Sequence, residues 1–132
     1  MRILIVDDDY VSRSQLKGLL SRYGDCDTAP TGSIAMELFE IAHKEGMPYS
    51  LISLDVDMPG LDGHGVLLRV REFEEGIGLP KHGTDIVKVL MVSALKDPDT
   101  IMDSFREGCE GFLPKPVTAA RLADAFVRFE LA

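Results

Sequence analysis

Polar side chains able to take part in phosphoryl chemistry follow four short apolar runs of this sequence, each at the point where the run ends. They are, in chain order, Asp7, Asp8 and Asp9, then Asp55, then Ser93, and finally Lys115. In open parallel sheets, ligands bind beyond the carboxyl ends of the strands. If the four runs are neighbouring parallel strands, these carboxylates, the hydroxyl and the ammonium group meet in one crevice.

Clustered carboxylates repel one another, and a hard divalent cation is the usual means of holding them together at neutral pH. Magnesium is the expected ion, because it combines one or two carboxylates with waters and phosphate oxygens. Asp55 could then act as a nucleophile that forms an aspartyl phosphate. Ser93 could donate a hydrogen bond to a phosphoryl oxygen, and Lys115 could neutralise part of the added charge.

Each of these residues also has a simpler interpretation when it is taken alone. An aspartate after a strand is most often a turn or cap residue, Ser93 could be a cap, and Lys115 could be a solvated charge. Asp9 is assigned to capping the next helix, because only two acidic residues are needed at the metal. The coincidence of complementary groups at four strand ends favours one phosphoryl-transfer site.

Short apolar runs alternate with amphipathic stretches along the chain, which is typical of an α/β fold with a parallel sheet. The runs at 3–6, 51–54 and 86–92 lack polar alternation, as expected of strands covered on both faces. Weaker strand candidates lie at 26–29 and 111–113.

Helices are predicted where apolar residues recur with a period of 3.6. Thr31 is the expected N-cap of a helix whose apolar stripe includes Ala35 and Phe39. Pro98 and Thr118 are expected to begin two later helices. Glycines and a proline interrupt the segment 74–85, which is interpreted as a long surface loop.

The length, net charge, cysteine spacing and apolar runs of the chain disfavour nucleic-acid-binding, disulfide-rich, zinc-binding and membrane-spanning proteins. The 132 residues fit one domain, 1–132, and a net charge of −8 disfavours direct binding to nucleic acid or an anionic membrane. Two distant cysteines, Cys26 and Cys109, are typical of reduced thiols rather than of a disulfide framework or a zinc site. No apolar run is long enough for a secretory signal or a membrane span, so we expect a cytoplasmic location.

With these residues identified, the sequence resembles the response-regulator receiver domains of two-component signal transduction, of the stand-alone CheY-like type. Four motifs support the resemblance. They are ILIVDDD at 3–9, LDVDMPGLDG at 54–63, VSA at 92–94 and GFLPKP at 111–116. The resemblance spans essentially the whole chain. Arg13 matches the arginine that is often present in the first helix of the family.

The resemblance implies a doubly wound, flavodoxin-like three-layer sandwich with a five-stranded parallel sheet of order 2-1-3-4-5. It implies that Asp7, Asp8 and Asp55 hold Mg2+ together with the backbone carbonyl of Asp57. It also assigns Asp55 as the phosphoacceptor, with Ser93, Lys115 and Phe112 as switch hydroxyl, phosphoryl contact and switch aromatic, respectively. The Lys115-Pro116 bond is expected to be cis.

In function, the resemblance implies a phosphoprotein that receives its phosphoryl group from a sensor histidine kinase or a phosphotransfer protein. Phosphorylation would switch its conformation, with self-phosphorylation and autodephosphorylation as its only reactions. No output domain is expected within the sequence, so a downstream protein would bind the face formed by 97–129. Asp57 and Leu95 lie two residues beyond the acceptor and the switch hydroxyl, where side chains can govern access of water.

Three other functions are compatible with parts of the pattern. Asp55 and Asp57 resemble the nucleophile and acid of haloacid-dehalogenase-like phosphotransferases, but that family carries this pair on its first strand. A flavin-binding flavodoxin would need a loop able to bind phosphate after the first strand, where three aspartates would repel it. A degenerate receiver that acts only by binding other proteins is disfavoured by the complete acidic set.

Overall fold

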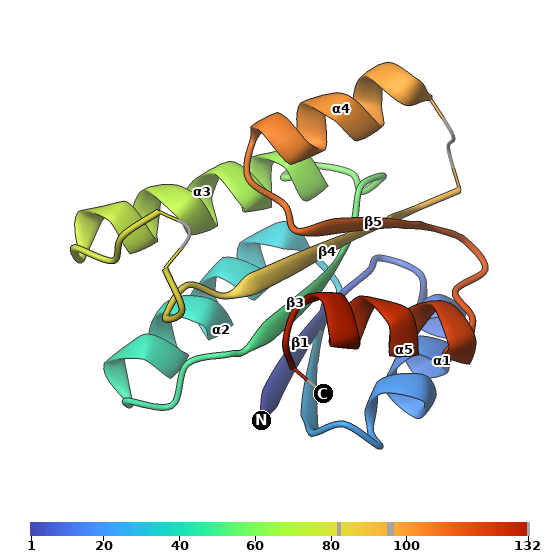
Figure 1. Cartoon of the computed structure of the whole chain (residues 1–132), viewed down its shortest axis with the longest axis horizontal. Coiled ribbons are helices and arrows are strands. Elements are labelled where there is room, and N and C mark those ends of the chain that lie inside the picture. The colour runs from blue at the N-terminus through green and yellow to red at the C-terminus, as the bar shows by residue number, and fades with distance from the viewer. Residues whose placement is uncertain (82, 95–96, 132) are drawn as a thin grey trace.

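The structure is a computed structural model, and it describes residues 1–81, 83–94 and 97–131. Five strands and five helices alternate along the chain (Figure 1). The strands are β1 (Arg2–Val6), β2 (Asp25–Ala29), β3 (Leu51–Asp55), β4 (Lys88–Ser93) and β5 (Gly111–Pro114). The helices are α1 (Tyr10–Leu20), α2 (Gly32–Lys44), α3 (Gly63–Gly76), α4 (Pro98–Arg106) and α5 (Ala119–Arg128). This confirms the predicted α/β architecture.

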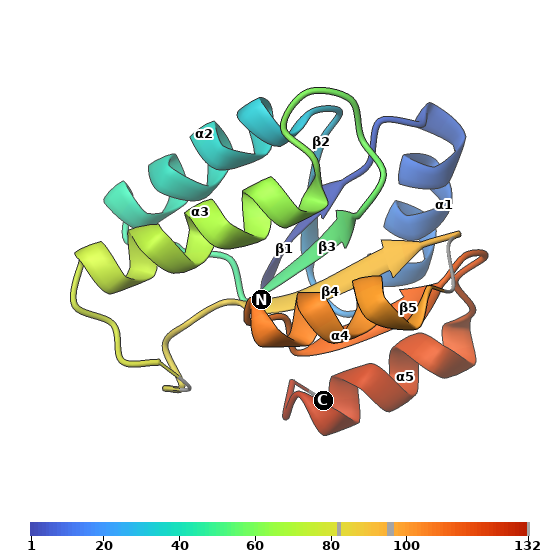
Figure 2. The ribbon, with the colours of Figure 1, turned by 90° about the horizontal axis from the view of Figure 1, so that it is seen from above.

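All strand pairs are parallel, and the sheet order is β2-β1-β3-β4-β5, as predicted. The central strands are buried on both faces, which explains their unbroken apolar sequences. In β1, Leu4 and Val6 pack into the core beneath α2 and α3, whereas Ile3 and Ile5 pack into the core beneath α1 and α5. The sheet therefore lies between two helical layers, which Figure 2 shows from above.

Helix starts follow the local signals in the sequence. Asp9, Thr31 and Thr118 cap α1, α2 and α5, and each side chain accepts a hydrogen bond from a backbone N–H of the first turn. Pro98 begins α4 as expected. The Lys115-Pro116 peptide is cis, as the resemblance implied.

The predicted loop at 74–85 is wrong at its start, because α3 continues to Gly76. Glu74 is buried in this last turn, with 2% of its surface exposed. Its carboxylate accepts hydrogen bonds from the Arg71 guanidinium at 2.7 Å and from the Val87 N–H at 2.8 Å. These contacts stabilise the last turn of α3, which the sequence analysis had predicted to be part of the loop.

Among the helices described, none combines the length and the apolar character needed to cross a membrane.

Candidate functional site

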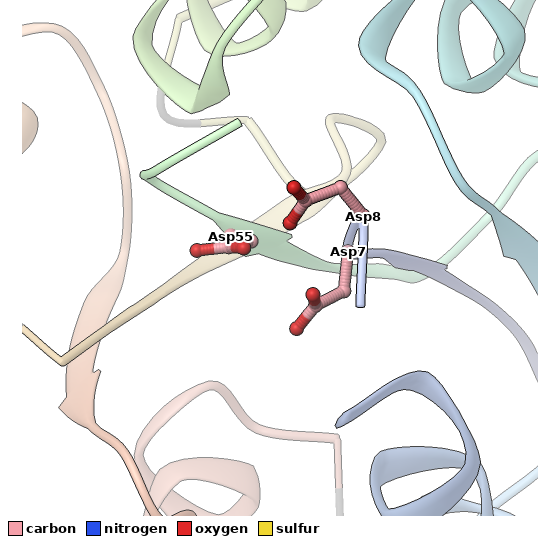
Figure 3. Close-up of side chains that lie close together, drawn as sticks. All are labelled: Asp7, Asp8 and Asp55. Carbon is pink, nitrogen blue, oxygen red and sulfur yellow. The ribbon is translucent and has the colours of Figure 1, made fainter. Parts of the chain in front are cut away.

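Three carboxylates converge at the carboxyl edge of the sheet, where β1 and β3 lie side by side. Residues Val6 and Leu54 are paired in register, so the aspartates that follow them emerge together. Figure 3 shows Asp7, Asp8 and Asp55 around one small space, and oxygen atoms of the three lie within 4.8 Å of one another. Asp7 and Asp55 are buried, whereas Asp8 is exposed. The structure therefore brings together the three side chains expected to hold a metal.

Lys115 enters the same site from the loop after β5. Its Nζ lies 3.0 Å from Asp7 Oδ2 and 3.4 Å from Asp55 Oδ2. Burial opposes the charge on this ammonium group, but the hydrogen bond to Asp7 and the charge of Asp55 together raise the pKa of Lys115. The lysine therefore remains a cation and compensates for part of the negative charge.

Backbone N–H groups orient the two buried carboxylates. The N–H of Asp9 donates to Asp7 Oδ1 at 2.9 Å, and the N–H of Asp57 donates to Asp55 Oδ1 at 3.1 Å. Arg13 adds a hydrogen bond from its guanidinium to the backbone carbonyl of Asp7 at 2.9 Å. Each carboxylate thus has one fixed oxygen, and Asp55 Oδ2 faces Lys115.

The donor set fits a magnesium ion. It consists of three carboxylates against one ammonium, so the site retains a negative charge that a divalent cation would offset. The exposed carboxylate of Asp8 could bind the ion from the solvent side while the buried pair provides ligands from the sheet. The backbone carbonyl of Asp57 as a further ligand stays a prediction.

The Ser93 hydroxyl forms a hydrogen bond with Asp57 that the sequence analysis did not predict. The sequence analysis had predicted that this hydroxyl would contact a phosphoryl group. Ser93 ends β4, next to β3, and is fully buried. Its Oγ donates a hydrogen bond to Asp57 Oδ2 at 2.9 Å. No local sequence signal indicates this bond, because the two residues are 36 positions apart.

Phe112 lies on β5 and is partly buried against the core beneath α2 and α3. Its role as a switch aromatic stays a prediction. Leu95, the other position singled out from the sequence, lies outside the described residues.

Gly63 supports the site in a way that the sequence analysis missed. This first residue of α3 is so close to β3 that a Cβ added to it would overlap the backbone carbonyl oxygen of Asp55 and lie 2.7 Å from Val56 Cα. Both obstacles are backbone atoms, which cannot move aside cheaply. Only glycine allows α3 to begin this close to Asp55.

We therefore expect Gly63→Ala to lower the free energy of unfolding by about 1–3 kcal/mol, as overpacking of a well-packed site does. Urea denaturation followed by circular dichroism measures this. Gly76→Ala is the matched control at the other end of α3, where an added Cβ would meet nothing within 4 Å. Equal stabilities of the two variants would contradict the steric argument.

The electrostatic environment of Asp55 makes stability depend on pH. Burial has the largest effect on the pKa of Asp55 and raises it, as does the nearby charge of Asp7. The hydrogen bond from the Asp57 N–H and the charge of Lys115 lower the pKa by less, so it rises from 3.8 to about 6. A raised pKa in the folded state means that the carboxyl contributes stability below about pH 4. That contribution is lost as the pH rises through 6.

Metal-free Asp55→Asn protein should therefore be more stable than metal-free wild type at pH 7 by about 1–3 kcal/mol, the equivalent of the shift in pKa. The difference should shrink as the pH falls from 7 to 4. Chemical denaturation in the presence of a chelator at several pH values measures it. A difference that grows toward low pH would contradict the assigned direction of the shift.

This chain is similar to known proteins in sequence and in fold. Residues 3–127 match the family model described as "Response regulator receiver domain". The chemotaxis protein CheY-3 of Vibrio cholerae is 33% identical over 126 residues, which cover 94% of this chain and 87% of that protein. The hybrid signal transduction histidine kinase L of Dictyostelium discoideum is 27% identical over 97% of this chain, which spans only 7% of the kinase's length.

A similar fold occurs in a crystal structure of a CheX–CheY complex with beryllofluoride and magnesium from Borrelia burgdorferi. The match has a TM-score of 0.80 and 26% sequence identity, and it covers 96% of this chain and 87% of the other. The family match, the relative that is similar over nearly its whole length and the sheet order agree. The chain belongs to the response regulator receiver domain family of CheY-like two-component signalling.

Proposed function

We propose that this chain accepts a phosphoryl group on Asp55, with Mg2+ bound by Asp7, Asp8 and Asp55, and that the modification changes its affinity for other proteins. The observation that carries this proposal is that Asp55 lies beside Lys115 and in one cluster with Asp7 and Asp8, the two carboxylates that follow β1. The presence of beryllofluoride and magnesium in the structure of the Borrelia relative supports the same chemistry.

In the proposed reaction, Asp55 Oδ2 attacks the phosphorus of the donor and forms a new O–P bond. The bond between phosphorus and the donor's leaving atom breaks, and the leaving group keeps the electron pair and takes up a proton. Bound Mg2+ would offset charge on the phosphoryl oxygens. Lys115 lies 3.4 Å from Asp55 Oδ2, from which its ammonium could bind one of those oxygens.

A sensor histidine kinase or a phosphotransfer protein would supply the phosphoryl group. The match to a hybrid histidine kinase supports this class of partner. The proposed output surface is the face formed by 97–129, where Met102, Phe105 and Val127 are 54%, 46% and 66% exposed, respectively. If amide exchange on this face stays unchanged when beryllofluoride and Mg2+ are added, the proposed surface is wrong.

Intact-mass spectrometry after incubation with acetyl phosphate tests the proposed chemistry. We expect one phosphoryl group per wild-type chain when Mg2+ is present and none on Asp55→Asn. Chelation of the metal should prevent labelling of the wild type. Equal labelling of both proteins would contradict the proposal.

A turnover assay on small phosphate esters separates a receiver from the haloacid-dehalogenase-like alternative. A receiver should show only stoichiometric labelling, with at most one phosphoryl group per chain. Rapid multiple turnover of small phosphate esters would instead support a phosphatase. We expect no such turnover.

A further inference from the structure

Asp57 connects the phosphoacceptor with the hydroxyl that is expected to respond to it. Its backbone N–H donates to Asp55 Oδ1 at 3.1 Å, and its side chain accepts the hydrogen bond from Ser93 Oγ at 2.9 Å. Asp57 is exposed in the loop after β3, whereas Ser93 is fully buried at the end of β4. Asp57 therefore contacts both the proposed phosphoacceptor, Asp55, and the proposed switch hydroxyl, Ser93.

The bond between Ser93 and Asp57 competes with the function proposed for Ser93. A serine hydroxyl carries a single proton, so it cannot donate to the Asp57 carboxylate and to a phosphoryl oxygen through the same hydrogen. If Asp55 is phosphorylated as proposed above, Ser93 must first release Asp57. The added phosphoryl charge would also repel the Asp57 carboxylate, which favours this release.

The backbone of Ser93 limits how this exchange can occur. Its carbonyl accepts a hydrogen bond from the Lys115 N–H at 2.9 Å, and the neighbouring Val92 carbonyl accepts one from the Val56 N–H at 3.0 Å. The end of β4 is thus held on both sides of the strand. Rotation of the Ser93 side chain would move its hydroxyl away from Asp57 without breaking these backbone bonds.

We propose that Asp57 is a positioning residue whose carboxylate holds the Ser93 hydroxyl in the unphosphorylated state and thereby opposes switching. The hydrogen bond is made only before phosphorylation, so it stabilises the inactive conformation selectively. A bond of this kind lowers the apparent affinity for any ligand that requires the active conformation. The inference rests on the proposed function of Asp55 and adds a determinant of how readily it switches.

Beryllofluoride binding at saturating Mg2+, measured by isothermal titration calorimetry, tests this inference. Substitution of Asp57 leaves its backbone carbonyl in place. We expect Asp57→Ala to bind beryllofluoride about three- to tenfold more tightly than wild type, the effect of losing one competing hydrogen bond. Asp57→Asn should give a smaller gain, because the amide oxygen still accepts from Ser93 without a charge.

A double-mutant cycle separates the hydrogen bond from simple charge repulsion. In a Ser93→Ala background the competing bond is absent, so Asp57→Ala should give at most a small gain in affinity. Asp62→Asn is the control for charge, because Asp62 is exposed in the same loop and the asparagine can still cap α3. It should leave the affinity nearly unchanged.

The beryllofluoride titrations distinguish a failure of this inference about Asp57 from a failure of the proposed function of Asp55. If wild type binds no beryllofluoride with Mg2+, the phosphoacceptor proposal itself fails. If wild type binds and Asp57→Ala gives the same gain with Ser93 or with Ala at position 93, the carboxylate acts only through its charge, and the inference is overturned. An unchanged or weakened affinity of Asp57→Ala overturns it as well.

Discussion

Phosphorylation of an Asp8→Asn variant by acetyl phosphate should be at least about 100-fold slower than that of wild type at low millimolar Mg2+. Asp8 is the exposed member of the three carboxylates, so its substitution would remove a proposed metal ligand without disturbing the core. A metal ion at a phosphoryl-transfer site contributes several kcal/mol to the transition state, and about 2.7 kcal/mol corresponds to the stated factor. The initial rate of acyl-phosphate formation measures the effect.

Asp9→Asn is the matched control for this substitution. Asp9 is the next residue along the chain and is also exposed, but it caps α1 instead of joining the cluster, and asparagine caps helices equally well. We expect its phosphorylation rate to stay close to that of wild type. The rate of Asp8→Asn should recover in part as Mg2+ is raised, because affinity is what the variant has lost. Equal rates for the two variants would remove Asp8 from the metal site.

The largest loss of stability is expected from Arg71→Ala. Arg71 lies near the amino ends of β4 and β5, whereas the carboxylate cluster lies at the carboxyl ends of the strands. Its guanidinium contacts the carboxylates of Glu74 and Glu110, each at 2.7 Å, and also donates to the carbonyls of Val87 and Gly108. These bonds join α3 to the residue before β4 and to the turn before β5. Removing one member of a largely buried ion network costs about 3–5 kcal/mol, because it leaves carboxylates away from water without a positive charge beside them.

Variants of Arg71 can separate charge from packing in a urea denaturation experiment. Arg71→Met keeps most of the side-chain volume and should still lose most of the stability. Glu74→Gln added to Arg71→Met should restore part of it, because it removes one of the uncompensated charges. Arg69→Ala, at an exposed position of the same helix, should change the free energy of unfolding by no more than about 0.5 kcal/mol. A loss below 1 kcal/mol in Arg71→Met would contradict the electrostatic explanation.

Much of the fold could be predicted because its determinants are local. The apolar runs of β1 and β3 reflect burial on both faces of the sheet, and Thr31 and Thr118 cap helices through bonds that span only three residues. The convergence of Asp7 and Asp55 required only the rule that ligands bind at the carboxyl ends of parallel strands. These features need no knowledge of distant partners.

The features that sequence analysis missed depend on partners that are distant along the chain. The end of α3 was placed too early because Glu74 is buried through contacts with Arg71 and with Val87, the residue before β4. The bond between Ser93 and Asp57 joins two different strand ends. The need for glycine at position 63 follows from the close approach of α3 to β3. Residue type and spacing carry no information about such tertiary contacts.

The central claim is that Asp55 is the residue modified and that its modification requires the metal. Reduction of an acyl phosphate with borohydride converts the aspartate into homoserine, which marks the modified position for peptide mass spectrometry. After treatment with acetyl phosphate and Mg2+, we predict homoserine at position 55 in the wild-type protein, none after chelation, and far less in Asp8→Asn at low Mg2+ than in wild type. Homoserine at positions 7, 8 or 57, or at position 55 in equal amount without Mg2+, would contradict the account.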